Sequence, residues 1–312
     1  MLEHRIAKLA AAATFVLLVI GGTVNPTGSS LACPEPTLVC HGQLFPPMVG
    51  GVLYEHGHRL AAMTVGMLQI ALTFLLFTRR PQLRRLAWLL LGLVIAQGAL
   101  GAITVKFKLP WFVSTSHLLL GMSYFATLIY TAFRTRPAPS PLELGRHERL
   151  RAELGPARRW IAIACGAVFV QLLLGALVRH LGAAMVCLGM PSCTRGGDWW
   201  PDAAVQDLHM IHRGFGVVVA IVTTAAAVAV WRSARSWPQL RRLALIAPVL
   251  VVAQIVLGIF TVLTLRAVPL AVGHFAGAAS LWALWMSAWL MTGRRQPAVE
   301  VEPIAQLHGV LA

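Results

Sequence analysis

Four histidines are the residues of this sequence whose type and position most directly indicate chemistry. Each lies near the outer end of a predicted membrane-crossing segment, at a similar depth: His58, His117, His212 and His274. Ionisable groups are costly in such segments and usually have a function there. Two histidines on facing helices can hold a haem iron between them. We therefore predict two pairs of axial iron ligands, His58 with His117 and His212 with His274; for any single histidine, helix packing is the alternative.

An arginine directly follows one histidine of each pair. Arg59 comes after His58, and Arg213 comes after His212. A guanidinium group binds a carboxylate through two parallel hydrogen bonds, which suits the propionates of a haem. The alternative is that both side chains extend to the membrane interface and bind nothing.

A carboxylate distinguishes the two pairs. Glu55 lies three residues before His58 and therefore on the same helix face. The shift of 154 residues that places His58 on His212 puts His209 at the position of Glu55. We predict that Glu55 is catalytic, either moving protons or stabilising a developing positive charge; a solvated glutamate is the alternative. His56 and His209 do not fit the repeated ligand pattern, and we interpret them as secondary contacts or surface groups.

Four of the five cysteines occur as two close pairs. Cys33 and Cys40 enclose one proline-containing loop, and Cys187 and Cys193 enclose another. Two local disulfides are the simplest interpretation outside the cytoplasm, and the first pair is alternatively redox-active. The absence of CxxC and CxxCH motifs argues against thioredoxin chemistry and covalently attached haem. Cys165 stands alone in an apolar segment and is interpreted as a buried small apolar residue.

The composition shows what must position these groups. The 312 residues are 57% hydrophobic and 12% charged, whereas soluble proteins carry about 25% charged residues. The mean hydropathy is +0.72. These values exclude a two-domain soluble enzyme, a disordered chain and a disulfide-rich secreted module. At roughly 20 residues per span, they predict an all-α polytopic membrane protein with eight transmembrane helices. The predicted spans are 8–24, 50–78, 86–104, 111–133, 159–178, 205–231, 242–264 and 269–292. The first segment is alternatively a signal peptide, but its counterpart in the second half favours a retained helix.

An internal repeat organises the spans. The sequence PQLRRLA occurs at 81–87 and again at 238–244, and the same shift of 157 places His117 on His274. We therefore predict two similar four-helix bundles in a parallel internal repeat. The predicted parts are an N-terminal half (1–136), a cytoplasmic linker (137–158), a C-terminal half (159–295) and a cytoplasmic tail (296–312).

The excess of basic residues is explained by topology. There are 26 lysines and arginines against 11 acidic residues. Of the 26, 19 fall on the side of the predicted termini and five on the opposite side. Because basic loops stay in the cytoplasm, both termini are predicted to be cytoplasmic, and the histidines and cysteines lie towards the outside of a cell membrane. The charge therefore reflects a protein of the lipid bilayer and not one that binds nucleic acid.

Together these motifs resemble the haem A synthase family, in the subgroup with extracytoplasmic cysteine pairs. The matching segments are EHGHRL (55–60), STSHLLLG around His117, MIHRGFG around His212 and VGHFAG around His274. The resemblance implies eight helices in two halves and oxidation of the C8 methyl group of haem O, by two hydroxylations and loss of water, to the formyl group of haem A. It further implies that His58 and His117 hold haem O, that Glu55 assists catalysis, and that His212 and His274 hold a haem b that relays electrons.

The resemblance also implies partners. Haem O synthase supplies the substrate, an unidentified electron donor is required, and the product serves cytochrome oxidase assembly. In this subgroup the first cysteine pair is thought to assist haem transfer or electron delivery. Two other functions compete: a non-enzymatic di-haem b electron carrier, and a transporter whose histidines relay protons. A carrier usually places its haems at different depths, and a transporter would show no haem absorption.

Overall fold

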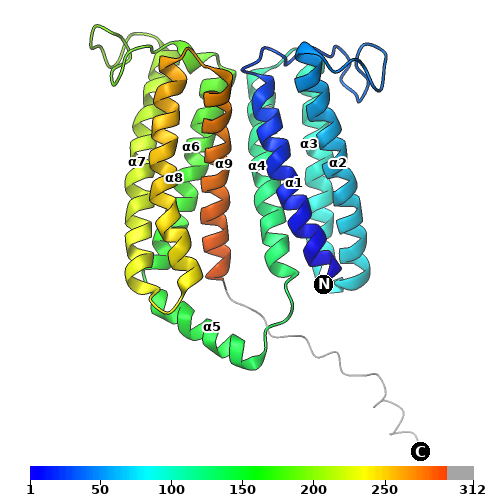
Figure 1. Cartoon of the computed structure of the whole chain (residues 1–312), viewed down its shortest axis with the longest axis vertical. Coiled ribbons are helices and arrows are strands. Elements are labelled where there is room, and N and C mark those ends of the chain that lie inside the picture. Colours follow the sequence, from blue (N-terminus) through cyan, green and yellow to red (C-terminus); the bar gives the residue numbers. More distant parts are fainter. Residues whose placement is uncertain (294–312) are drawn as a thin grey trace, which may run out of the picture.

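The computed structural model describes residues 1–293, which are helical and contain no β-strand (Figure 1). Eight helices in this part of the chain are long and apolar enough to cross a membrane, which confirms the predicted all-α polytopic fold. They are α1 (Leu2–Val24), α2 (Gly50–Arg79), α3 (Arg84–Lys106), α4 (Trp111–Arg134), α6 (Ala157–His180), α7 (Ala204–Ser233), α8 (Pro238–Leu263) and α9 (Val268–Met291). The predicted tail 296–312, and Arg294 and Arg295, lie outside the described residues.

The outer surface of the helices is apolar, as a membrane protein requires. Phe74, Trp88, Ile221 and Val249 each expose more than 60% of their surface. Because lipid is as apolar as these side chains, their exposure costs nothing in a bilayer, whereas it would cause aggregation in water. The chain is thus a multi-pass membrane protein.

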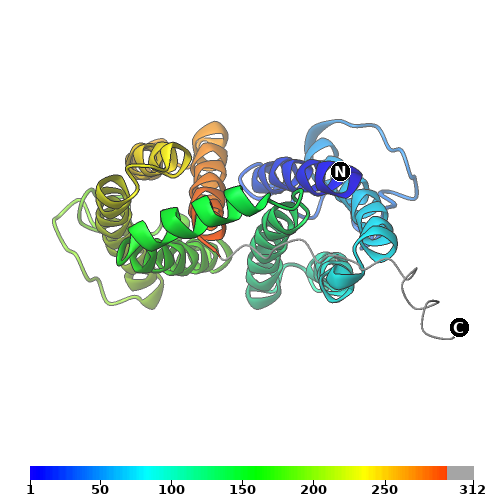
Figure 2. The same ribbon diagram turned by 90° about the horizontal axis from the view of Figure 1, so that it is seen from below.

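The spanning helices form two groups of four that lie side by side (Figures 1 and 2). In one group α1 packs against α2 and α4, and α3 packs against α4; in the other α6 packs against α7 and α9, and α8 packs against α7 and α9. The groups meet where α1 contacts α9 and where α4 contacts α6 and α9. Buried apolar side chains fill both groups, and one cluster continues across their boundary from α4 to α6 and α9.

Two tight links have the same unusual backbone. Lys108 and Leu109, between α3 and α4, have φ of 56° and 66°, and Leu265 and Arg266, between α8 and α9, have φ of 51° and 70°. Successive left-handed residues other than glycine are rare because the Cβ atom crowds the backbone. The two links are related by the shift of 157 residues found in the sequence. This agreement is an argument for the internal repeat, which, like the domain boundaries, stays a prediction.

The predicted linker contains a helix that the sequence analysis did not anticipate. α5 (Pro141–Leu154) lies across the end of the α6–α9 group, on the side where the N-terminus is found (Figures 1 and 2). Ser140 and Glu143 form a capping box at its start, which satisfies two backbone N–H groups that the helix leaves free. His147 Nε2 donates to the carbonyl oxygen of Gly293 at 2.8 Å, which ties α5 to the end of α9.

The opposite end of the molecule carries the long loops 25–49 and 181–203, the second of which includes the short helix η2 (Ala183–Met185) (Figure 1). We call it the disulfide end, because both cysteine pairs lie there. His58 and His212 each lie eight residues beyond the first residue of α2 and α7, and His117 and His274 six residues beyond the first residue of α4 and α9. All four histidines are therefore in the part of their helices that is nearer to the disulfide end.

Candidate functional site

Each of the four histidine rings packs against a glycine of the preceding spanning helix. A Cβ atom built on that glycine would lie between 2.7 and 3.3 Å from the ring carbon Cε1. The pairs are His58 with Gly21 (2.7 Å), His117 with Gly101 (3.3 Å), His212 with Gly175 (3.2 Å) and His274 with Gly258 (3.2 Å). These distances are shorter than ordinary contacts between carbon atoms, so glycine is what allows each ring its position.

The four supporting glycines are functional candidates that the sequence analysis missed. A signal for them was present, because the shift of 154 places Gly21 on Gly175 and the shift of 157 places Gly101 on Gly258. Glycine in a helix costs about 1 kcal/mol relative to alanine. Its occurrence at all four ring contacts indicates that the close approach of the helices matters more than this local cost.

His212 and His274 face each other across the second group of helices. Their ring centroids are 6.5 Å apart and the ring planes are 84° from parallel. A metal–imidazole bond is about 2 Å long and the ring centroid lies about 1 Å beyond the nitrogen, so two imidazoles on opposite sides of one metal have centroids about 6 Å apart. The observed separation therefore fits two axial ligands of one iron.

The hydrogen bonds of His274 leave one ring nitrogen available. Its Nδ1 is 3.0 Å from the carbonyl oxygen of Gln254, and because a carbonyl only accepts, Nδ1 must carry the proton. Nε2 is then unprotonated and can bind a metal. Nδ1 of the other three histidines is buried without a partner, and no Nε2 of the four is hydrogen-bonded within residues 1–293. All four rings thus retain the nitrogen that a metal needs.

The environment of the first pair differs in one contact. His58 and His117 lie close enough to interact electrostatically. Gln97 donates to the carbonyl oxygen of His117 at 2.9 Å, and in the second group Gln171 donates to the carbonyl oxygen of His212 at 3.0 Å. The position equivalent to Gln171 beside His58 is Leu17, by the shift of 154. The His58 side therefore lacks a polar contact that the His212 side has.

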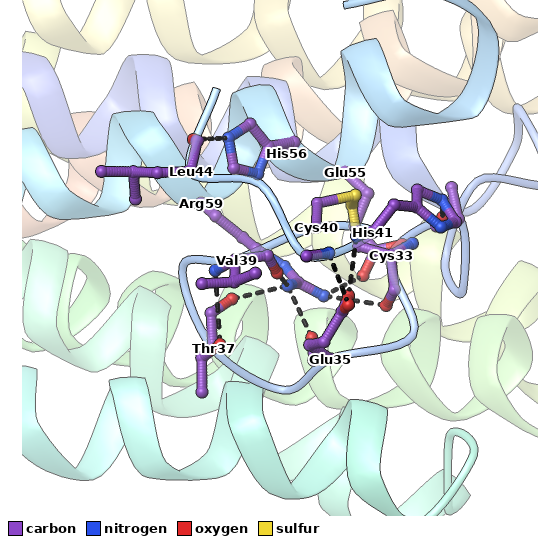
Figure 3. The surroundings of a disulfide bond; sticks show 12 residues. Cys33, Glu35, Thr37, Val39, Cys40, His41, Leu44, Glu55, His56 and Arg59 are labelled. Atoms are coloured by element: carbon purple, nitrogen blue, oxygen red, sulfur yellow. Dashed lines mark hydrogen bonds and ion pairs between the residues drawn. A yellow bond between two sulfur atoms is a disulfide. The ribbon is translucent and has the colours of Figure 1, made fainter. Parts of the chain in front are cut away.

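Arg59 holds the first cysteine loop (Figure 3). Its Nη1 donates to the carbonyl oxygens of Glu35 and Thr37, both at 2.6 Å, and of Val39 at 3.1 Å. Its Nη2 donates to the carbonyl oxygen of Cys33 at 3.1 Å. Loop carbonyl groups that would otherwise lack partners near the membrane are satisfied in this way.

Arg213 holds the second loop with the same geometry. Its Nη1 donates to the carbonyl oxygens of Gly189 at 2.9 Å and Ser192 at 3.1 Å, and its Nη2 to that of Cys187 at 2.6 Å. Both guanidinium groups are therefore directed to loop carbonyls. Binding of haem propionates by Arg59 and Arg213 stays a prediction.

Glu55 is buried, with only 4% of its surface exposed. Its Oε1 pairs with Arg59 Nη2 at 2.6 Å, and its Oε2 accepts a hydrogen bond from the backbone N–H of Cys33 at 2.9 Å (Figure 3). The alternative of a glutamate solvated at the helix end is therefore wrong, because the loop covers the carboxylate. His209, at the equivalent place in α7, is equally buried.

Both predicted disulfides are present, Cys33–Cys40 and Cys187–Cys193. His56 is fully buried beside the first, with a ring nitrogen and both sulfur atoms within 4.8 Å of one another, so its interpretation as a surface group is wrong. Its Nε2 donates to the carbonyl oxygen of Leu44 at 2.9 Å. Met210 packs beside the second disulfide. Cys165 is a free, partly buried thiol.

Glu35 orders the tip of the first loop. Its carboxylate accepts hydrogen bonds from the backbone N–H groups of Gly42 at 2.9 Å and His41 at 3.0 Å. Its own backbone N–H and those two groups hold the pKa of Glu35 below its usual value, because they stabilise the charged form. The shift of 154 places Gly189 at this position in the second loop, which has no carboxylate to play this part.

Fold and site together define a polytopic α-helical membrane protein with two pairs of glycine-packed histidines beneath two disulfide loops. Residues 48–286 match the model of the family described as Cytochrome oxidase assembly protein (COX15-CtaA). The chain belongs to this family.

Three relatives cover most of the chain. Heme A synthase of Maricaulis maris is 31% identical over 271 residues, which are 78% of this chain and 73% of that protein. Heme A synthase of Shouchella clausii is 27% identical over 270 residues, 84% of this chain and 87% of that protein. Heme A synthase of Bacillus licheniformis is 25% identical over 269 residues, 84% and 86% respectively. The family and these relatives identify the chain as a membrane-bound oxidoreductase and confirm the resemblance drawn from its motifs.

Proposed function

We propose that this protein is a haem A synthase, which oxidises the C8 methyl group of haem O to a formyl group. The substrate haem lies in the first group of helices between His58 and His117, and a haem b lies in the second between His212 and His274. The relatives named heme A synthase support the reaction. The observation that carries the proposal is the set of four histidines, each packed on a glycine, with the second pair at the separation expected for two axial ligands.

The chain's own residues determine how each haem is held. His58 and His117 bind the iron of the substrate and thereby place its macrocycle at a fixed depth, near the disulfide end. His212 and His274 do the same for haem b, which supplies one-electron transfer when it is bound. The Gln254 carbonyl oxygen fixes the proton of His274 on Nδ1, so that ring presents its metal-binding nitrogen without rearrangement.

Glu55 has the catalytic role in this proposal. Arg213 holds the second loop without the help of any carboxylate, whereas Arg59 holds the first loop and also pairs with Glu55. Holding a loop therefore does not require Glu55. We assign to it the exchange of a proton at Oε2, the oxygen that is not paired with Arg59.

The orientation follows from charge and cysteine chemistry. The side of the termini carries 19 basic residues in the sequence and the opposite side five, which favours cytoplasmic termini. Disulfides persist outside the cytoplasm, which favours an extracytoplasmic disulfide end in the cell membrane. The partners in this proposal are haem O synthase as the source of the substrate, an electron donor and the assembly of cytochrome oxidase, which the family description supports.

The experiment is pigment extraction from membranes of a host that makes haem O and no haem A. Expression of the chain should convert a substantial part of the haem O to haem A, separated by chromatography. A chain with His58→Ala and His117→Ala, which should not bind the substrate, is the control and should leave haem O unchanged. Membranes that contain the wild-type protein with bound haem but no haem A would show a di-haem electron carrier instead, and a protein without haem absorption would favour the transporter.

A further inference from the structure

Arg179 is a cation near the disulfide end that has no counter-charge. It is the second-last residue of α6 and points between the two groups of helices, towards α1 and α9. Its Nη2 makes two long contacts, 3.5 Å to the carbonyl oxygen of Gly21 and 3.4 Å to that of Gly22. Its Nε is buried and has no hydrogen-bond partner. No carboxylate in residues 1–293 forms an ion pair with it.

The other two arginines of this end are satisfied, which makes Arg179 distinctive. Arg59 donates to four loop carbonyls and pairs with Glu55, and Arg213 donates to three loop carbonyls. A guanidinium group has five N–H donors, and Arg179 uses only one nitrogen. A charge withdrawn from water without a partner costs several kcal/mol, so the position is explained when an anion binds there.

A second cation reinforces the site. Arg266 interacts electrostatically with Arg179, and its Nη2 donates to the carbonyl oxygen of Asn25 at 3.2 Å. The shifts of 154 and 157 place Asn25 and Leu109 at the equivalent positions in the first half, so neither cation is repeated. Both belong to the five basic residues on the side where the positive-inside rule disfavours them. Two like charges close together favour an anion between or beside them.

The location of Arg179 indicates which anion it meets. Gly21, whose carbonyl oxygen Arg179 contacts, is also the glycine against which the His58 ring packs. The charge of Arg179 acts directly on His58. On its other side the guanidinium lies 5.9 Å from the ring centroid of Phe275, the residue after His274. An anion bound by Arg179 therefore lies beside the first histidine pair, at the boundary with the second.

We propose that Arg179, a residue of the second half, binds a carboxylate of the haem held in the first half and so positions the substrate. This inference rests on the proposed function, which places a haem between His58 and His117. A haem carries two propionate groups, and guanidinium binds a carboxylate with geometric specificity. The second half thus completes the substrate site of the first, which explains why these cations occur once and not twice.

The test uses the whole purified protein with its resident haem, titrated with iron protoporphyrin IX and with its dimethyl ester, whose carboxylates are uncharged. The wild type should bind the free acid more tightly than the ester. Arg179→Gln should weaken binding of the free acid by about tenfold or more, the factor that one charge-assisted hydrogen bond provides, and leave the ester unaffected. Arg179→Lys should keep part of the preference. Arg195→Gln, which removes an exposed cation from the loop 181–203, is the matched control and should change neither affinity.

Several outcomes would overturn the inference. Equal affinities of the wild type for acid and ester would do so even where Arg179→Gln fails to fold, as would an equal loss of both ligands in that variant. Loss of a bound anionic lipid from Arg179→Gln in native mass spectrometry, with haem affinity unchanged, would assign the cation to a lipid headgroup. A wild type that binds no haem would reject the proposed function, and this inference with it; a wild type that binds haem without any effect of Arg179 rejects the inference alone.

Discussion

The two cysteine loops are held in the same way but stand over different chemistry. In both, an arginine that follows a metal-ligand candidate donates to the carbonyl oxygen of the first cysteine, 26 residues earlier in the chain. Beneath the first loop lie Glu55 and His56, and beneath the second lie His209 and Met210 at the equivalent positions. The shared part is thus structural, and the part that differs consists of groups that exchange protons. The comparison teaches that one architecture was kept for holding two haems and that catalysis was added to one of them.

The largest effect is expected at the carboxylate. Glu55→Gln keeps the size of the side chain and removes its charge, so we expect haem binding to persist while conversion of haem O falls by about a hundredfold or more, the usual contribution of a proton-transferring group. Haem A is measured in extracts and bound haem by absorption. Glu35→Gln, which alters a carboxylate at the tip of the same loop, is the control and should retain activity. Normal amounts of haem A with Glu55→Gln would leave the two halves without the chemical difference argued above.

The two loop arginines should differ in their importance for stability. Arg59→Gln removes the partner of a buried carboxylate, for which about 3–5 kcal/mol is expected. Arg213→Gln removes hydrogen bonds from loop carbonyls only, for which about 1–3 kcal/mol is expected. Thermal unfolding in detergent and the rate of proteolysis in each loop measure the difference. An equal loss in both variants would mean that Glu55 is not dependent on Arg59, against the contact of 2.6 Å between them.

The smallest effect is expected at a supporting glycine. A Cβ at Gly21 would lie 2.7 Å from the His58 ring, so Gly21→Ala should displace the ring at a cost of about 1–3 kcal/mol. The helix itself should gain slightly from alanine. Gly92→Ala is the matched control, since nothing lies within 4 Å of its Cβ position. Binding of added haem should weaken in the first variant and not in the second; unchanged binding in Gly21→Ala would separate the glycine contact from ligand placement.

Composition and spacing were sufficient to predict the spans and the ligand candidates. Eight apolar stretches predict eight helices because a membrane leaves the backbone few other choices, and His58 and His274 stand out because polar residues are rare in such stretches. The capping residues Ser140 and Glu143 announce α5, yet a short polar helix in a proline-rich linker has little pattern to distinguish it. What could not be predicted depends on contacts between distant segments. The pairing of Arg59 with the loop, the approach of Gly21 to His58 and the isolation of Arg179 arise only when the helices pack.

The central claim is that each half binds one haem through its own pair of histidines, and haem content after removal of single ligands tests it most directly. His212→Ala and His274→Ala should each lose the haem of the second half, seen as a fall in bound haem and a changed absorption spectrum, while the first pair still binds added haem. His209→Ala, one helical turn before His212, should keep both. Unchanged haem content and spectrum in His212→Ala and His274→Ala would contradict the account.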